Sequence, residues 1–397
     1  MTRDVLELGD IGLDEGAHVC IRHELAGLER GDELRVRGSS PTLRIDLGAF
    51  CRSEGHDLRE DAGLFILRRG AAAGARDRNA TRAGAADAER PDAVWERPPA
   101  SFGLAPRGAR VEAGSPELRF PLDEKSVVWA DEAGRLYAQA AAQQWDPEHA
   151  IPWHERVELP AELEDAVVQI MTYLIENETA ALIVPARFAA QVHPHFREVQ
   201  QLLAIQAADE ARHIEVFTRR ALLWRTELAL STAGGQASLA TLIEEPDFSL
   251  AALLLSVLGE GSFLSLLWFL HEHGPDPVTR AVARLAAQDE ARHVAFGLAH
   301  LARHVELEPN LLTRMASAIE RRHLALSTTA GLNAEVFDAL VLVAARSYDP
   351  AAIRRGYGAV VALTVEMDKG RRSRLEKLGF DATQAEHLSS LHTRNFM

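Results

Sequence analysis

The spacing of apolar residues divides the chain into a short mixed part and a long helical part. From residue 126 almost to the end, apolar residues recur at every third or fourth position, which is the period of a helix with one buried face. Proline and glycine residues interrupt this pattern, and a glycine-containing turn is expected at 231–236. The interruptions delimit predicted helices at 127–144, 161–191, 194–230, 250–273, 277–305, 310–328, 334–348, 350–378 and 382–391.

The first 70 residues differ, because helical and alternating stretches follow one another there. The predicted order is strand 4–8, helix 19–29, strand 33–37, helix 43–54 and strand 64–67. This β-α-β-α-β order predicts a small two-layer α+β domain over residues 1–70.

Residues 71–125 separate the two parts. The segment 71–100 is rich in Ala, Arg, Gly, Asp and Pro, so it cannot bury enough apolar surface to offset the entropy of ordering. We therefore predict three regions: the α+β domain at 1–70, a largely flexible linker at 71–125 and a mainly α domain at 126–397.

Composition excludes several classes of protein. The net charge of −15 argues against a nucleic acid or an anionic membrane as the main partner. Residues 1–14 lack the basic patch of a signal peptide, and Glu260 interrupts the most apolar stretch, so no membrane segment is expected. The only two cysteines, Cys20 and Cys51, exclude a disulfide framework and a four-cysteine metal site, and they fit a reducing cytoplasm.

One five-residue sequence occurs twice. Asp-Glu-Ala-Arg-His is found at 209–213 and again at 289–293, 80 residues later. Each copy contains Glu-x-x-His, which places a carboxylate and an imidazole on one face of a helix, one turn apart. Two such pairs, with one further Glu from each of two other helices, are the ligands of a two-metal site in helical bundles.

Each copy has a matching Glu upstream in an apolar helix. Glu178 lies 32 residues before Glu210, and Glu260 lies 30 before Glu290. A turn between the two helices of each half brings these residues side by side. Glu176 competes with Glu178, but the repeat aligns Glu178 with Glu260. The predicted metal ligands are Glu178, Glu210, His213, Glu260, Glu290 and His293.

The residue types fit iron or manganese, which carboxylates and imidazoles bind well. Four carboxylates balance two divalent cations, with Glu210 and Glu290 as bridges and Glu178 and Glu260 as terminal ligands. The alternative is a duplicated hairpin whose Asp/Arg and Glu/His pairs are solvated at the surface. This alternative does not explain Glu260, because burying an acid among apolar residues without a cation costs free energy. The residues predicted to surround the ligands, with each Arg able to pair with an Asp, are Asp209, Arg212, Asp289 and Arg292.

Residues 126–305 resemble the ferritin-like di-iron carboxylate superfamily through these motifs. The Asp-Glu-x-Arg-His form is most similar to hydroxylase subunits of bacterial monooxygenases, ribonucleotide-reductase-like oxidases and the p-aminobenzoate N-oxygenase group. The resemblance implies a ferritin-like bundle with two Fe ions, or a Mn/Fe pair, that uses O2 for hydroxylation, N-oxygenation or desaturation of a small organic substrate. It also implies His323 as an additional ligand, as in the N-oxygenase group. The chain has no reductase domain, so an external electron donor is expected.

Residues 1–70 resemble the TusA-like sulfur carriers. The similarity lies in Arg-Gly-Asp-Glu-Leu at 30–34, in Ala-Phe-Cys-Arg at 49–52 and in the closing residues 65–69. The reactive Cys-Pro pair of that family is missing, so we expect a domain that docks a protein partner rather than one that transfers sulfur.

Two other functions use the same bundle. One is an iron-handling ferroxidase of the ferritin type, and the other is a non-enzymatic metal-bound scaffold. The helices predicted after His304 favour an enclosed pocket over storage. The sequence does not determine the substrate, whether the chain forms a homodimer, or whether the metal pair is Fe/Fe or Mn/Fe.

Overall fold

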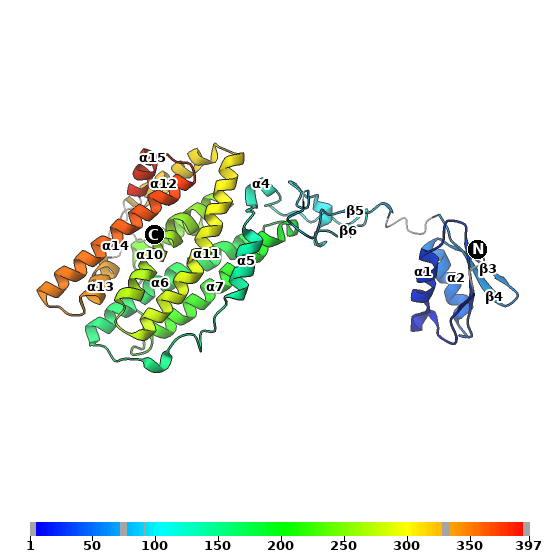
Figure 1. Cartoon of the computed structure of the whole chain (residues 1–397), viewed down its shortest axis with the longest axis horizontal. Coiled ribbons are helices and arrows are strands. Elements are labelled where there is room, and N and C mark those ends of the chain that lie inside the picture. The colour runs from blue at the N-terminus through cyan, green and yellow to red at the C-terminus, as the bar shows by residue number, and fades with distance from the viewer. Residues whose placement is uncertain (1–4, 72–77, 91, 328–333, 392–397) are drawn as a thin grey trace. The chain divides into compact units, whose positions relative to one another are not determined.

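The computed structural model describes residues 5–71, 78–90, 92–327 and 334–391, and the chain forms two compact units (Figure 1). One unit comprises Met1–Asp87 and Gly108–Pro116, and the other comprises Ala88–Arg107 and Glu117–Met397.

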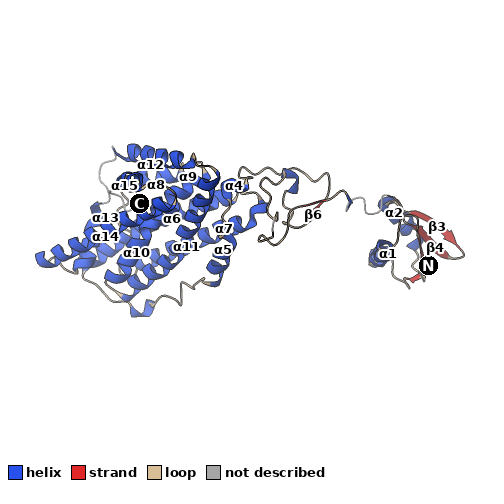
Figure 2. Cartoon of the chain, turned by 45° about the horizontal axis from the view of Figure 1, so that its top comes forward, coloured by secondary structure: helices blue, strands red, loops and turns tan. Residues whose placement is uncertain are grey.

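The N-terminal unit has a four-stranded sheet with two helices, shown in Figure 2. Its elements are β1 (Leu6–Glu7), α1 (Ala17–Ala26), β2 (Glu33–Arg37), α2 (Leu43–Glu54), β3 (Asp57–Asp61) and β4 (Leu64–Arg68). The strand order is β1-β2-β4-β3, with β1 parallel to β2 and the other pairs antiparallel. Ile21, Leu47 and Leu67 are fully buried between the layers, which confirms the predicted two-layer α+β fold.

Strand β3 was not predicted, because its sequence is Asp-Leu-Arg-Glu-Asp and none of its side chains is buried. It lies at the edge of the sheet, where polar residues protect the open hydrogen-bonding groups.

The predicted linker contains segments that pack. Strand β5 (Thr81–Arg82) pairs with β6 (Arg110–Val111) in the first unit. Residues 88–107 belong to the second unit, where the Trp95 amide donates to His195 Nε2 at 2.9 Å. The Arg107 guanidinium binds the Glu198 carboxylate at 2.5 Å. A few anchors therefore compensate for the low apolar content of this segment.

Helices make up nearly all of the second unit. They are α4 (Lys125–Val128), α5 (Ala133–Ala142), α6 (Ala161–Ala189), α7 (Arg197–Ala221), α8 (Ala233–Ile243), α9 (Phe248–Ala252), the π-helix η5 (Leu253–Glu260), α10 (Gly261–His273), α11 (Pro277–Leu307), α12 (Leu311–Ser327), α13 (Ala334–Ala345), α14 (Pro350–Lys377) and α15 (Ala382–Ser390). Short 3₁₀ turns of this unit are η2 (Ala100–Phe102), η3 (Trp153–Glu155) and η4 (Pro194–Phe196), and the first unit has η1 (Leu13–Glu15).

Two hairpins form the centre of this unit, as Figure 1 shows. Helix α6 packs along α7, and the continuous segment α9–η5–α10 packs along α11. Helices α13 and α14 cover the outside of α6 and α10. The predicted ferritin-like helical bundle with additional C-terminal helices is therefore confirmed.

The boundaries differ from the prediction in several helices; the predicted helix 194–230, for example, is α7 and ends at Ala221, nine residues early. The predicted helix 127–144 is interrupted after α4, because Trp129 is extended and its indole N–H binds the Asp131 carboxylate at 2.8 Å. The predicted turn at 231–236 includes the first residues of α8 instead. There the Thr232 hydroxyl accepts the Gly235 amide at 3.0 Å, so this N-cap starts a helix despite two glycines.

Two helical segments, Ala161–Ala189 and Phe248–His273, are long and apolar enough to cross a membrane by length and composition alone. Within their most apolar windows, 67% and 89% of the residues are buried in the bundle, as in the core helices of a globular protein.

A buried ion cluster joins the two hairpins. Arg220 at the end of α7 binds both carboxylate oxygens of Glu164 on α6, at 2.7 and 3.0 Å. The same guanidinium reaches Asp276, the N-cap of α11, at 2.9 Å, and the hydroxyl of Thr279 at 2.8 Å. All four side chains are at most 2% exposed, so each charge depends on its partners.

Candidate metal centre

The six residues predicted as metal ligands lie together in the middle of the bundle. They come from α6, α7, η5 and α11, and each is at most 4% exposed. Their ligand atoms form two overlapping groups, in each of which all atoms lie within 4.8 Å of one another. The first group is Glu178, Glu210, His213 and Glu290, and the second is Glu210, Glu260, Glu290 and His293.

Each imidazole turns Nδ1 toward the carboxylates. His213 Nδ1 lies 3.5 Å from Glu178, 3.1 Å from Glu210 and 3.4 Å from Glu290. In the other group, His293 Nδ1 lies 3.0 Å from Glu210 and 3.4 Å from Glu290. Glu210 and Glu290 are thus shared by both groups, which is the position of bridging carboxylates between two ions.

Glu260 reaches the site from the π-helix. A π-helix has a wider turn than an α-helix and is frequent at functional sites. All eight residues of η5 are buried, and Glu260 is the last of them. Its Oε1 accepts a hydrogen bond from the Gln206 amide at 2.9 Å. The first half of the site differs in this respect, because Glu178 lies in the α-helix α6.

The aspartates of the repeated motif bind the histidines of the opposite copy. His213 Nε2 lies 3.2 Å from Asp289, and His293 Nε2 lies 3.3 Å from Asp209. A carboxylate accepts, so a neutral ring, as needed for metal binding, would carry its proton at Nε2 and direct the lone pair of Nδ1 toward the ligand group. The two bonded pairs are 76 and 84 residues apart in sequence, and through them α7 and α11 orient each other's imidazoles.

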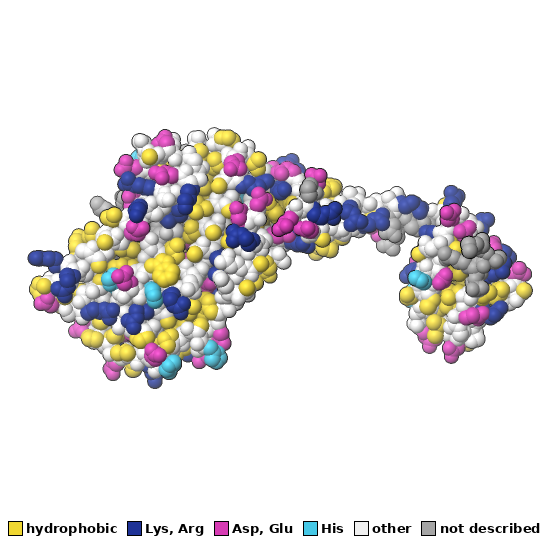
Figure 3. Space-filling view, in the orientation of Figure 1, with side chains coloured by type: hydrophobic (Ala, Val, Ile, Leu, Met, Phe, Trp, Pro, Cys, Tyr) yellow, Lys and Arg dark blue, Asp and Glu magenta, His cyan; other side chains and the backbone are white. Residues whose placement is uncertain are grey.

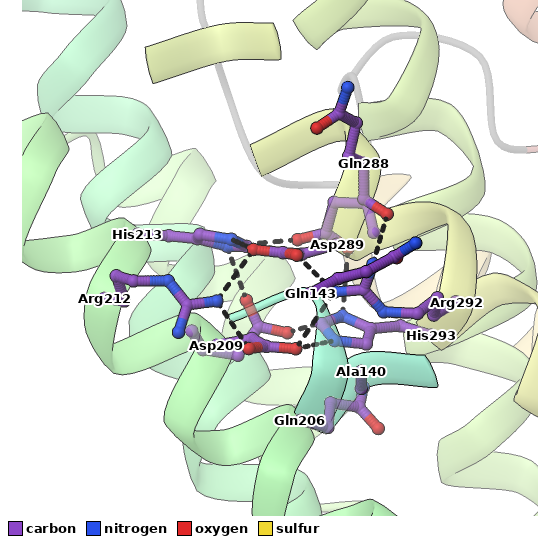
Figure 4. A network of polar contacts seen from close by, with 12 residues as sticks. Ala140, Gln143, Gln206, Asp209, Arg212, His213, Gln288, Asp289, Arg292 and His293 are labelled. Carbon is purple, nitrogen blue, oxygen red and sulfur yellow. Dashed lines mark hydrogen bonds and ion pairs between the residues drawn. The ribbon is translucent and has the colours of Figure 1, made fainter. Parts of the chain in front are cut away.

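Arginines and amides close this side of the site, as Figure 4 shows. Arg212 donates to Asp209 at 2.5 Å and to Asp289 at 2.8 Å, and Arg292 binds Asp289 as well. The Trp145 indole N–H donates to Asp289 at 2.8 Å. These bonds hold the aspartates ionised: burial alone would raise the pKa of Asp289, but its hydrogen bonds lower it.

The Gln144 amide adds a bond to Asp209 at 2.7 Å, and Gln143 accepts from Arg292 at 3.0 Å. Together with Trp145 and Gln206, these residues were missed by the sequence analysis. Gln206 could have been found, because it lies four residues before Glu210 on the same helical face. Residues 143–145 could not have been found, because they are distant in sequence from the residues that they contact, and no local motif marks them.

The carboxylates of the cluster repel one another. Burial raises the pKa of Glu178, and the charges of Glu210 and Glu290 raise it further. Burial likewise raises the pKa of Glu260, with Glu290 again adding to the effect. Metal cations among the carboxylates would relieve this repulsion at Glu178 and Glu260.

The same atoms lack hydrogen bonds. Among the described residues, five buried atoms of the cluster have no hydrogen-bond partner: Glu178 Oε1, Glu210 Oε1, Glu260 Oε2, Glu290 Oε2 and His293 Nδ1. Unsatisfied buried acceptors are costly in a native fold. Lone pairs gathered around a common centre fit two metal ions, which would satisfy them and balance their charge.

Two other candidates lie outside the cluster. Glu176 is half-buried on α6 and belongs to neither ligand group, so the geometry favours Glu178. His323 on α12 is also absent from both groups, and its Nδ1 lies 2.9 Å from the Leu391 carbonyl. The ring faces the end of α15, and within the described part of the chain no hydrogen bond or ion pair joins it to the six residues above.

Replacing Asp209 with Asn should weaken metal binding, because the amide cannot hold the His293 proton as a carboxylate does. We expect roughly a 10- to 100-fold loss of Fe(II) affinity, the range typical for residues that orient metal-bound histidines. Chelator competition under argon measures this. The exposed Asp165→Asn, on α6, should leave the affinity unchanged; an equal loss in both variants would contradict the orienting role.

Gly297 lies one turn after His293 and lets η5 approach α11 closely. A Cβ added at Gly297 would sit 2.4 Å from the Ser256 Cβ, which cannot move without the π-helix backbone. We expect Gly297→Ala to lower the free energy of unfolding by about 1–3 kcal/mol and to weaken metal binding, because Glu260 shifts with η5. Urea unfolding and Fe(II) titration measure the two effects.

Gly358→Ala is the matched control, since a Cβ at this exposed position of α14 meets no atom within 4 Å. It should stabilise the protein by about 0.4–1 kcal/mol and leave metal binding unchanged. Unaltered Fe(II) affinity in Gly297→Ala would show that Glu260 does not depend on this contact.

The fold and the site define a helical bundle with a buried carboxylate and histidine cluster suited to two metal ions. No known protein family matches the sequence, and no curated protein is significantly similar to it. Solved structures with a similar arrangement include a variant of an R2-like ligand-binding oxidase with an aerobically reconstituted Mn/Fe cofactor (17% identity, 63% of this chain and 94% of that chain, TM-score 0.49). Another variant of that oxidase carries an Fe/Fe cofactor and gives the same values (17%, 63%, 94%, 0.49).

A protein with aldehyde deformylating oxidase activity from Synechococcus is also similar (18% identity, 58% of this chain and 96% of that chain, TM-score 0.43). The resemblance of the N-terminal unit to sulfur carriers finds no support in these comparisons.

Proposed function

We propose that this chain is a non-haem oxidoreductase that holds two iron ions, or one manganese and one iron, and uses O2 to oxidise a small organic substrate. The observation that carries the proposal is the pair of overlapping ligand groups, each with three carboxylates and one imidazole, that share Glu210 and Glu290. These ligand types suit iron and manganese. Two redox-active ions, when bound, supply the electrons that activate O2.

The protein's own residues prepare this chemistry. The terminal carboxylates Glu178 and Glu260 each complete one ligand group, and the histidines present Nδ1 because their Nε2 protons are held by aspartates. Burial of all six side chains keeps bulk water away from the reacting centre. Hydroxylation, N-oxygenation and desaturation of a small molecule are the reactions that such a site supports, with electrons from a separate donor protein.

Anaerobic titration with Fe(II), followed by exposure to O2, tests the proposal. We expect two Fe(II) per chain, uptake of O2 by the loaded protein, and further uptake only when an electron donor is supplied. Glu260→Ala, which removes a ligand from one of the two groups, should bind fewer than two Fe(II) per chain and serves as the control. Oxidation of many irons per chain into a ferric mineral would indicate iron storage instead, and a loaded protein that consumes no O2 would indicate a scaffold.

A further inference from the structure

Helix α14 carries two arginines that turn inward, toward the end of the π-helix η5. Figure 3 shows Lys and Arg side chains spread over the visible surface of the helical unit, where water solvates them. Arg371, in contrast, is only 6% exposed, and the Nη2 atom of Arg374 is buried. Both side chains contact residues at the junction of η5 and α10, where the metal ligand Glu260 lies. Their placement therefore needs an explanation other than solubility.

Side chains hold the carbonyl groups at this junction. A carbonyl group bonds the amide five residues later in a π-helix and four residues later in an α-helix, so the regular series of bonds is interrupted where one changes into the other. Arg374 Nε donates to the Val257 carbonyl at 2.7 Å. The Ser262 hydroxyl donates to the Leu258 carbonyl at 2.7 Å and accepts a bond from Arg371 at 3.4 Å. Two carbonyl groups just before the metal ligand are thus fixed from α14, one directly and one through a serine.

Glycine at position 261 gives the guanidinium its place. The backbone of Gly261 has ordinary helical angles, with φ at −62° and ψ at −28°, so its conformation does not require glycine. A Cβ added there would lie 2.4 Å from both Cζ and Nε of Arg374. A Cβ added at Gly370, one turn earlier on α14, would lie 3.0 Å from the Nη1 atom of the same side chain. The two glycines therefore form a slot for this guanidinium beside Glu260.

The charge of Arg374 is poorly compensated in this slot. Among the residues that the structure describes, no carboxylate forms an ion pair with its guanidinium, and Nη2 has no hydrogen-bond partner. Burial and the charge of Arg371 lower the pKa of Arg374 to about 10. A buried charge without a counter-ion is less favourable than an apolar side chain of similar volume. The arginine is therefore explained by the bond that it makes to the Val257 carbonyl rather than by a gain in stability.

We propose that Arg374 is a positioning residue, which holds the end of η5 so that Glu260 stays in the second ligand group. The inference rests on the proposed function. The Gln206 amide binds Glu260 Oε1 at 2.9 Å, but Oε2 is buried without a partner, so the position of that oxygen depends on the backbone that carries it. Arg374 acts through the backbone of residues 257–261 and bonds to none of the six ligands in the described part of the chain.

Anaerobic Fe(II) titration of the full chain, in variants that keep a single ligand group, tests the proposal. Glu178→Gln leaves the second group complete, and Glu260→Gln leaves the first group complete. Arg374→Met keeps the length of the side chain but removes the donor. In the Glu178→Gln background it should weaken Fe(II) binding about tenfold, within the range seen for residues that orient metal ligands. In the Glu260→Gln background it should leave Fe(II) binding unchanged, whereas general damage to the fold would weaken both.

A control, a second variant and a metal-free measurement complete the test. Arg355→Met changes an exposed arginine of the same helix and should leave both affinities unchanged. Gly261→Ala displaces the guanidinium by its Cβ, so it should show the selective loss even where Arg374→Met folds poorly. Hydrogen exchange in the metal-free chain, followed by mass spectrometry, should be faster over residues 257–262 in Arg374→Met than in Arg355→Met, because the end of η5 opens more often.

The outcomes separate this inference from the proposed function. Equal losses of affinity in the two backgrounds, or no loss in either, would overturn the positioning role of Arg374, as would unchanged hydrogen exchange at 257–262. A chain that binds Fe(II) with the expected selective loss but consumes no O2 would refute the proposed function and leave the positioning role intact. A chain that binds no Fe(II) would also refute the proposed function, and hydrogen exchange would still decide whether Arg374 holds the end of η5.

Discussion

Glu290→Gln should abolish binding of both metal ions, whereas Glu178→Gln should abolish binding of one. The difference follows from the geometry, because Glu290 belongs to both ligand groups and Glu178 to only one. Gln keeps the volume of the side chain but removes its charge, so the core stays filled. Metal analysis after anaerobic loading should give two ions per chain for the unmodified protein, one for Glu178→Gln and none for Glu290→Gln.

Glu176→Gln is the matched control for this series, because residue 176 lies on the same helix and outside both groups. It should retain two ions. The metal-free forms of Glu178→Gln and Glu290→Gln should be at least as stable to heat as the unmodified metal-free protein, since each loses a carboxylate from a crowded cluster. Lower thermal stability in both would mean that metal loss reflects damage to the fold.

Arg220→Met should cause the largest loss of stability, about 3–5 kcal/mol in the free energy of unfolding. The guanidinium holds Glu164 and Asp276, and its removal leaves two buried carboxylates without their cation. The loss should appear in urea unfolding of the metal-free protein, followed by circular dichroism. The two hairpins share this contact, so the helical unit of the variant should still unfold in one transition.

Arg219→Met tests whether the burial of Arg220 is decisive. Arg219 is the neighbouring residue, but it pairs with Glu148 at the surface, where the two side chains are 36% and 63% exposed. Surface pairs contribute about 1 kcal/mol or less, so Arg219→Met should have little effect. A similar decrease in the free energy of unfolding for both variants would mean that the buried cluster does not stabilise the fold more than the surface pair does.

The helical period made the bundle and the six clustered residues predictable from the sequence. Glu178 and Glu260 could be found because each lies in an apolar helix at a matching distance before Glu-x-x-His. The π-helix could not be found, since its residues Leu253–Glu260 are as apolar as those of a buried α-helix.

Contacts between distant residues were also beyond the sequence. Trp145 and Asp289 are 144 residues apart, and nothing in the short connection after α5 marks it as part of the site. The crossed bonds from Asp209 and Asp289 to the opposite histidines are a property of how the hairpins face each other. The identical motifs indicated which residues would lie together, but not that each aspartate would bind the histidine of the other copy.

The crossed bonds have the contact rule of a two-fold symmetric dimer, in which residue i of one subunit meets residue j of the other and j meets i. Asp209 meets His293, and Asp289 meets His213. Each histidine is oriented by an aspartate of the other hairpin. One hairpin alone would therefore lack the bond that orients its histidine. The two copies of the motif therefore form a single interface. A change of the aspartate in one copy affects first the orientation of the histidine in the other copy.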